Sequence, residues 1–198
     1  RLGRFLGEKA GVARQVQEAG MVFVGPYAEV LALFGDKARA RALALECGVP
    51  VLHGIDHAVT LAEATAFFAA LPAAAAMVIK AVAGGGGRGM RVVASADEIE
   101  NAFARCQSEA QSAFGDGSVY VEQCAPLARH IEVQILGDGT ECVHLHEREC
   151  TLQRRHQKLI EVAPSPSLSA TLRARIIDAA LTLARAIHYR SLGTFEFL

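Results

Sequence analysis

The sequence predicts an α/β fold in three successive parts: the end of an N-terminal α/β layer, a small α+β unit, and the start of an antiparallel sheet. A helix–strand–helix run over residues 8–48 indicates the first part. Capping boxes open the helices of the second part, and alternating apolar and polar residues begin the third. We therefore expect domains at residues 1–51, 52–124 and 125–198.

Composition limits the class of protein. The chain has 198 residues, of which 52% are hydrophobic and 21% charged, with a net charge of -1. These values are typical of a soluble globular protein and favour neither nucleic-acid nor membrane binding. The most apolar stretch, residues 73–79, is far shorter than the roughly 20 residues of a membrane span. Five cysteines without C-x-x-C spacing argue against a disulfide framework. They favour a cytoplasmic location, or an organellar matrix in a eukaryote.

In the first part, residues 8–19 are predicted to form a helix that ends at Gly20. Residues 21–24 (Met-Val-Phe-Val) are predicted to form a short buried strand, stopped by Gly25 and Pro26. A second helix should begin at Asp36, a suitable N-cap, and end at Cys47 and Gly48. The strand finds no partner before it in the chain, so we expect its sheet to begin upstream.

In the second part, Thr60–Glu63 and Ser95–Glu98 match the capping box and should open helices at 61–71 and 96–113. Short apolar runs predict strands at 77–81, 90–94 and 119–123. The first two are joined by the glycine loop Gly84–Gly89.

The third part begins with a strict alternation of polar and apolar residues. Ile131, Val133 and Ile135 should share one strand face, and His130, Glu132 and Gln134 the other. Residues 142–146 alternate as well, a helix is expected at 170–187, and a last strand at 194–198. On that strand Phe195 and Phe197 should point to the core, and Glu196 away from it.

The glycine loop has two interpretations. It lacks the Lys-Ser or Lys-Thr of a P-loop and leads into a strand, unlike a dinucleotide-binding turn. A glycine loop between two strands is typical of a flap over nucleotide phosphates, which Lys80 on the entering strand could also meet. The alternative is a flexible hairpin tip with a surface lysine.

Several segments occur together in an order and spacing typical of one family: Phe23–Pro26, Gly35–Lys37, Val78–Ala81, Gly84–Met90, Arg129–Gln134, Glu147–Lys158 and Gly193–Leu198. They resemble the biotin carboxylase branch of the ATP-grasp family, and the resemblance covers nearly the whole chain. The run Gln153–Lys158 is the most specific of these segments. Arg1–Lys9 matches the family only loosely.

The resemblance implies the fold and the reaction. The fold would be ATP-grasp, with residues 52–124 as the lid and 125–198 as the start of the main ATP-binding sheet. The enzyme would be a ligase that uses ATP and bicarbonate to carboxylate biotin on a carrier protein, through carboxyphosphate. Its cofactors would be ATP and Mg²⁺ or Mn²⁺, with carrier-bound biotin as substrate.

The resemblance also assigns residues. Lys37 and Lys80 would contact ATP phosphates, beneath a lid that contains Gly86 and Gly87. The segment Glu122, Gln123, Cys124 and Ala125 would run past the adenine. His130 and His156 would touch the nucleotide, Lys158 would meet bicarbonate as the catalytic residue, and Glu196 would bind the metal. From the residues alone, solvated surface groups are the favoured interpretation of Glu196 and of the basic run 154–158.

Partners follow from the same resemblance. They would be a biotin carboxyl carrier protein or domain and a carboxyltransferase component, in a homodimer or larger assembly. The acyl acceptor stays open among acetyl-, propionyl-, methylcrotonyl- and geranyl-CoA, pyruvate and urea. Further family residues would follow Leu198, so we expect this fragment alone to be inactive.

Three other interpretations remain. The chain could belong to another ATP-grasp ligase, such as a carbamoyl-phosphate synthase large chain, or to a nucleotide-binding module without catalysis. Cys142, His144, His146 and Cys150 could form a zinc site, although their spacing is not a standard zinc pattern.

Overall fold

The computed structural model describes residues 9–83, 89–154 and 157–198. The chain divides into two compact units, which we describe separately. The four-stranded unit comprises the described residues of 1–35, 46–49 and 127–198. The three-stranded unit comprises residues 36–45 and 50–126. None of the helices in the described part of the chain is long and apolar enough to cross a membrane.

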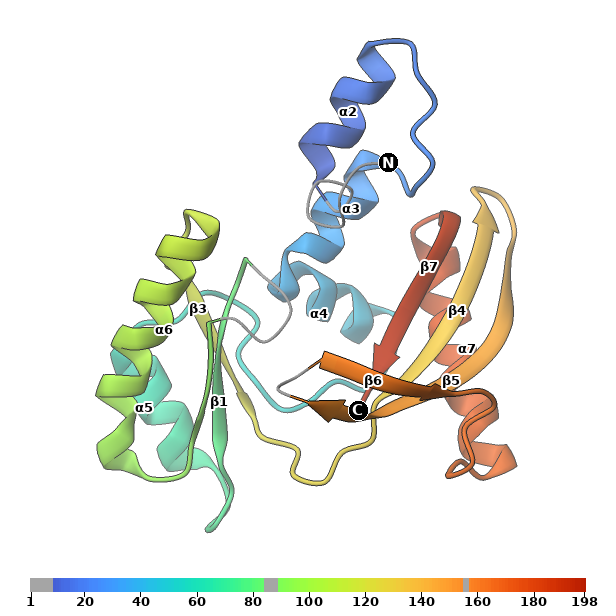
Figure 1. Cartoon of the computed structure of the whole chain (residues 1–198). Coiled ribbons are helices and arrows are strands. Elements are labelled where there is room, and N and C mark those ends of the chain that lie inside the picture. The colour runs from blue at the N-terminus through green and yellow to red at the C-terminus, as the bar shows by residue number, and fades with distance from the viewer. Residues whose placement is uncertain (1–8, 84–88, 155–156) are drawn as a thin grey trace. The chain divides into compact units, whose positions relative to one another are not determined.

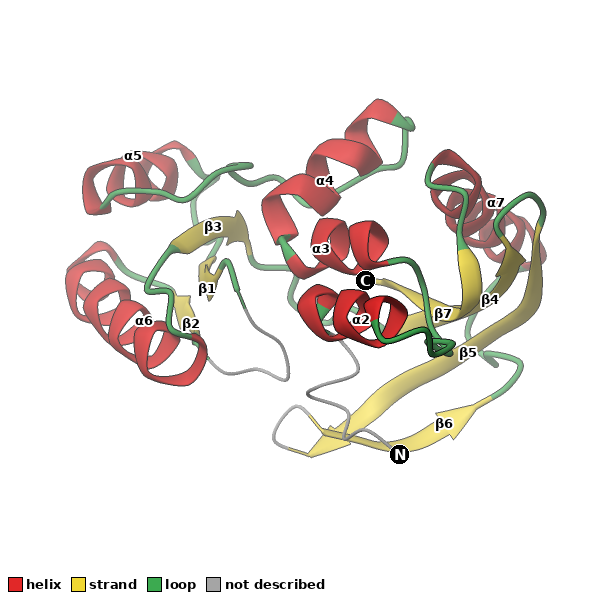
Figure 2. Cartoon of the chain, turned by 90° about the horizontal axis from the view of Figure 1, so that it is seen from above, coloured by secondary structure: helices red, strands yellow, loops and turns green. Residues whose placement is uncertain are grey.

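The three-stranded unit is an antiparallel sheet with helices packed on one face (Figure 2). Its strands are β1 (Met77–Ala81), β2 (Met90–Val93) and β3 (Val119–Gln123), in the order β2-β1-β3. The helices are α5 (Leu61–Ala70) and α6 (Ile99–Phe114), the latter preceded by the 3₁₀ turn η1 (Ala96–Glu98). Helix α4 (Lys37–Glu46) also belongs to this unit.

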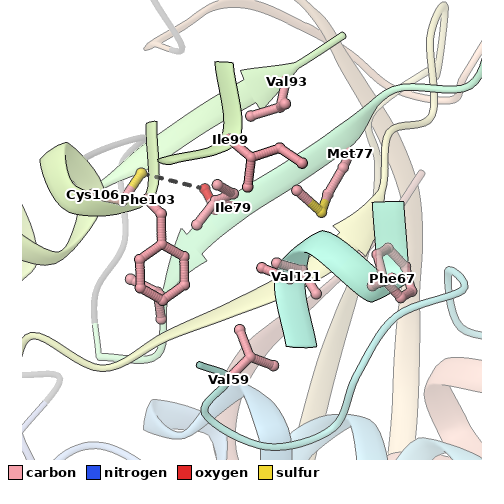
Figure 3. Packing of buried hydrophobic residues seen from close by; sticks show 11 residues of the cluster. Val59, Phe67, Met77, Ile79, Val93, Ile99, Phe103, Cys106 and Val121 are labelled. Atoms are coloured by element: carbon pink, nitrogen blue, oxygen red, sulfur yellow. Dashed lines mark hydrogen bonds between the residues drawn. The ribbon is translucent and has the colours of Figure 1, made fainter. Parts of the chain in front are cut away.

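Alternation along the strands separates the face that packs on the helices from a second face, which carries Lys80 and Glu122 beside the buried Val78 and Tyr120 and which we call the polar face. Met77, Ile79 and Val121 are fully buried against α5 and α6 (Figure 3). Burial of each such side chain stabilises the fold by about 1.5–3 kcal/mol. Because neighbouring side chains point to opposite faces, Lys80 and Glu122 lie on the face away from this core.

The helix ends of this unit form as the sequence predicts. Thr60 and Glu63 make the capping box of α5, and Glu98 accepts a hydrogen bond from the Ser95 backbone N–H at 3.3 Å. Asp36 Oδ1 accepts hydrogen bonds from the backbone of Ala38 and Arg39, which makes Asp36 the N-cap of α4.

The four-stranded unit is an antiparallel sheet in the order β6-β5-β4-β7 (Figure 1). Its strands are β4 (Ile131–Asp138), β5 (Cys142–Arg154), β6 (Gln157–Val162) and β7 (Arg190–Phe197). Helix α7 (Ala170–Ala186) covers one face and packs on Val133 and Ile135. Phe195 and Phe197 pack against the same core, as predicted.

The first segment of this unit corrects one prediction. Residues 21–24 form no strand, and the side chains of Val22 and Val24 are 81% and 90% exposed. A strand needs a hydrogen-bonding partner, and none of the described strands pairs with this segment. Two helices instead flank it: α2 (Ala10–Glu18), which the sequence predicts, and α3 (Ala28–Gly35), which it does not. Helix α3 joins the core through Val30 and Phe34.

Candidate functional site

Lys80 and Glu122 form an ion pair on the polar face of the three-stranded sheet. Val78 of β1 lies opposite Glu122 of β3, so Lys80, two residues along β1, is the diagonal neighbour of Glu122. Glu122 is only 5% exposed. A buried carboxylate requires a cationic partner, and Lys80 supplies it.

Lys37 stands beside this pair. It is the first residue of α4, and its Nζ donates a hydrogen bond to the Ala81 carbonyl oxygen at 3.0 Å. A backbone bridge between Asp36 and Ala83 holds the start of the helix next to the end of β1. Burial, followed by the charge of Lys80, lowers the pKa of Lys37 to about 8. Neighbouring ammonium groups that repel each other are suited to an anion of high charge, such as a nucleotide phosphate.

Arg41 is a further member of this group that sequence reasoning missed. Its Nη1 lies 3.9 Å from Glu122 Oε2, and its Nη2 donates to the Leu52 carbonyl oxygen at 2.7 Å. Residue 41 lies one helical turn after Lys37, so the i, i+4 spacing on α4 was the available signal. Arg41 thus provides Glu122 with a second cation, at Oε2, whereas Lys80 contacts Oε1.

The predicted adenine segment follows directly from β3. The backbone N–H groups of Gln123 and Cys124 donate to the carbonyl oxygens of His53 and Ala76, both at 2.7 Å. These two donors are therefore used within the fold, and recognition of a base here would depend on carbonyl oxygens or on Ala125. Gly86, Gly87 and His156 lie outside the described residues.

The polar face of the four-stranded sheet carries the second group of predicted residues. Glu132 of β4 and Glu196 of β7 are direct cross-strand partners, and Lys158 of β6 contacts both carboxylates. Glu132 is 2% exposed, whereas the Glu196 side chain is 58% exposed. The structure thus brings together Lys158 and Glu196, which the sequence identified, and adds Glu132 between them.

Arg148 of β5, like Glu132, is a residue to which the sequence assigned no role. Its guanidinium lies 2.5 Å from Glu132 Oε2 and 3.1 Å from Glu161 Oε2, and donates to Gln134 Oε1 at 3.0 Å. Arg148 is the register partner of Glu132. Two signals for this network were available in the sequence: the alternation that placed Glu132 and Gln134 on the polar face, and the family-like segments 129–134 and 147–158, which contain Glu132 and Arg148.

His130 precedes β4 in the same unit. Its backbone N–H donates to Thr151 Oγ1 at 3.1 Å, and its carbonyl oxygen accepts from Cys150 N at 2.8 Å. These bonds fix the backbone of His130 two residues before Glu132.

The sequence offers two candidate metal sites: a zinc site at Cys142, His144, His146 and Cys150, and a magnesium site at Glu196. Cys142 and Cys150 are buried, and all five cysteines are unpaired. Within residues 9–83, 89–154 and 157–198, no group of three or more His, Cys, Asp or Glu side chains is placed to hold a metal ion. Magnesium needs only one or two carboxylates and keeps several waters. The exposed Glu196 carboxylate fits that requirement.

Comparisons with known proteins identify the family and the fold of this chain. Residues 36–198 match the family model described as "Carbamoyl-phosphate synthase L chain, ATP binding domain". Pyruvate carboxylase of Schizosaccharomyces pombe is 48% identical over an alignment of 201 positions that covers 98% of this chain. The chain spans 16% of the length of that relative.

Solved structures extend the comparison. The biotin carboxylase domain of Hydrogenobacter thermophilus 2-oxoglutarate carboxylase, in complex with MgADP, ADP and bicarbonate, matches with a TM-score of 0.93 and 38% identity. A biotin carboxylase–beta-gamma-ATP complex from Campylobacter jejuni matches with a TM-score of 0.92 and 40% identity. The matches cover 98% and 99% of this chain, and 43% and 44% of those chains. They confirm the predicted fold class.

Proposed function

This chain belongs to the carbamoyl-phosphate synthase L chain ATP-binding domain family, and from that premise we propose that it supplies the ATP- and bicarbonate-binding residues of a biotin carboxylase. The lysine pair Lys37 and Lys80 is the observation that carries the proposal. Two cations, one with a pKa lowered by burial and by its neighbour, are arranged for polyphosphate rather than for packing.

The proposed reaction begins with transfer of the γ-phosphoryl group of ATP to a bicarbonate oxygen, which gives ADP and carboxyphosphate. Carboxyphosphate then breaks into CO₂ and phosphate, and CO₂ forms a bond to a ureido nitrogen of biotin, which gives up its proton to the released phosphate. Lys37 and Lys80 hold the phosphates, and Lys158 holds bicarbonate. Fixed charges in these positions do most of the work in such transfers.

Glu196 is the proposed magnesium ligand. Its exposed carboxylate and the proximity of Lys158 are the supporting observations. When bound, Mg²⁺ would neutralise charge on the phosphates. The segment Glu122, Gln123, Cys124 and Ala125 is proposed to meet the adenine, and His130 the nucleotide. Gly86 and Gly87, as lid residues, and His156, as a nucleotide contact, remain proposals from the sequence alone.

The proposed partners are a biotin carboxyl carrier protein or domain and a carboxyltransferase component. Relatives named pyruvate carboxylase support this assignment. The biotin carboxylase relative of Hydrogenobacter thermophilus is described as a domain dimer, which supports a homodimer or larger assembly. The cytoplasm, or the mitochondrial matrix in a eukaryote, is the proposed location.

Phosphate release tests the proposal. The complete gene product that carries residues 1–198 is incubated with ATP and Mg²⁺, with and without bicarbonate and free biotin. We expect phosphate release to require bicarbonate and to rise when biotin is added. ATP turnover that does not depend on bicarbonate would exclude the proposal. Turnover that requires bicarbonate but ignores biotin would favour another ligase of the same family.

A further inference from the structure

We propose that Arg148 is a positioning residue, which fixes the Glu132 carboxylate and, through it, the Lys158 ammonium that we assign to bicarbonate. The inference rests on the proposed function. Arg148 lies on β5 and belongs to none of the residue assignments made from the sequence.

The Arg148 guanidinium contacts side chains on several neighbouring strands at once. Its side chain reaches Glu132 and Gln134 on β4 and Glu161 on β6, and also donates to Thr194 Oγ1 of β7 at 3.4 Å. One planar guanidinium therefore joins β5 to three other strands on the polar face. Because the planar guanidinium presents its N–H donors in fixed directions, the carboxylate and amide groups that it binds keep little rotational freedom.

Glu132 transmits this constraint. One carboxylate oxygen, Oε2, lies 2.5 Å from Arg148 Nη2, and the other, Oε1, contacts Lys158 Nζ. Because Glu132 is 2% exposed, water cannot replace either partner. A shift of Glu132 therefore displaces Lys158.

Charge gives Arg148 a second effect on Lys158. Among the described residues of this network, three carboxylates (Glu132, Glu161 and Glu196) face two cations, Arg148 and Lys158. Arg148 offsets the charge of Glu132 and Glu161. Without it, Lys158 would be the one cation of this described network facing three carboxylates, and bicarbonate, itself an anion, would be repelled.

The test compares Arg148→Met with Arg173→Met in the complete gene product. Arg173 is the matched control, because its Nε pairs with Glu147 Oε1 at 2.8 Å, and Glu147, on β5, is like Glu132 a buried carboxylate at 2% exposure. Glu147 lies in register with the core residue Val133, so this pair sits on the opposite sheet face. Both variants remove the cation that pairs with a buried glutamate, but only Arg148→Met removes a contact to Glu132, the partner of Lys158.

We expect Arg148→Met to lower kcat/KM for bicarbonate by about 10- to 100-fold, the size of effect that misplacement of a reacting group produces. The KM for ATP should change no more than in Arg173→Met. In a Glu132→Gln background the loss should largely disappear, because Arg148 acts through Glu132. Equal changes for bicarbonate in the two arginine variants, or full additivity with Glu132→Gln, would overturn the inference.

Arg148→Lys covers the case in which Arg148→Met does not fold. Lysine keeps the positive charge next to Glu132, but one ammonium cannot serve Glu132, Gln134 and Glu161 together. We expect a folded protein with a several-fold higher KM for bicarbonate, and a wild-type KM would overturn the inference. If the wild-type protein shows no bicarbonate-dependent ATP turnover, the proposed function fails first, and the assignment of Arg148 fails with it.

Discussion

Glu132 and Glu196 lie directly opposite each other on neighbouring antiparallel strands, and both contact the Lys158 ammonium. Directly opposed like charges destabilise a sheet unless a cation lies between them. Their environments differ, because Glu132 is buried and Glu196 is exposed. From this asymmetry we propose different tasks for the two carboxylates: Glu132 holds Lys158, and Glu196 exchanges Lys158 for a metal ion.

The first prediction concerns Glu196→Gln. Loss of the carboxylate should raise the Mg²⁺ concentration needed for half-maximal activity by about 10- to 100-fold, the equivalent of one lost charge-assisted contact. The measurement is phosphate release by the complete gene product over a magnesium titration. Glu141→Gln, in the exposed β4–β5 hairpin, is the control and should titrate like the wild type. The same magnesium requirement in Glu196→Gln would exclude Glu196 as a ligand.

The second prediction separates binding from stability at Lys80. Lys80→Ala should weaken ATP binding by about 1.5–3 kcal/mol, the value of a hydrogen bond to a charged group. It should also destabilise the protein, because Glu122 loses its closest cation. Adding Glu122→Gln should restore the stability, but the ATP affinity of the double variant should stay weak.

Calorimetric titration with ATP and thermal unfolding measure the two effects. Arg39→Ala, at an exposed position on α4, is the control for the loss of a positive charge near Lys37. If the double variant recovers the wild-type affinity for ATP, the role of Lys80 is to pair with Glu122 and not to bind phosphate.

The local patterns in the sequence predict the fold well where a short segment determines its own structure. The capping residues Thr60 and Ser95 placed two helix starts, and alternation at Ile131–Ile135 placed the core face of β4. The strand predicted at residues 21–24 was wrong, because an apolar run forms a strand only with a partner. Propensity alone cannot supply that information.

The candidate site shows the same limit. Lys158 and Glu196 were found through motifs, and the structure places them in contact. Arg148 was not found, because its importance depends on the register that sets it opposite Glu132 and on reaching Glu161 and Thr194. Contacts between distant strands are set by pairing, which a single sequence does not encode in any short segment.

The third prediction concerns acid stability at Glu149. Hydrogen bonds from the hydroxyl of Ser167, at 2.6 Å, and then from Ser165, at 2.8 Å, lower the pKa of Glu149 to about 2. The folded-state pKa lies below the usual value of 4.5, so the stabilisation is complete above about pH 4.5 and is lost as the pH falls towards 2.

Glu149→Gln should therefore lower the thermal midpoint at pH 7, and the difference from wild type should shrink as the pH falls below about 4.5. Thermal unfolding at pH 7 and pH 3.5 makes the comparison. Glu141→Gln again serves as the control, because it removes a carboxylate from the exposed hairpin. A difference that is the same at both pH values would show that Glu149 does not titrate as its hydrogen bonds imply.

The last prediction follows from the lowered pKa of Lys37. Because this pKa is about 8 instead of the usual 10.5, the unfolded chain binds the proton more tightly than the folded protein between those values. The nucleotide-free protein should therefore become more stable as the pH rises from 8 to 10.5. ATP binding should show the opposite trend, because phosphates favour the protonated ammonium.

From pH 7 to pH 9 the apparent Kd for ATP should rise about tenfold, as Lys37 loses its proton. Lys37→Arg supplies the decisive control, because a guanidinium stays charged throughout this range. Any titration of the nucleotide itself appears in both profiles, so the difference between them isolates Lys37. If wild type and Lys37→Arg show parallel pH profiles for ATP binding, the charge of Lys37 does not contribute to phosphate recognition.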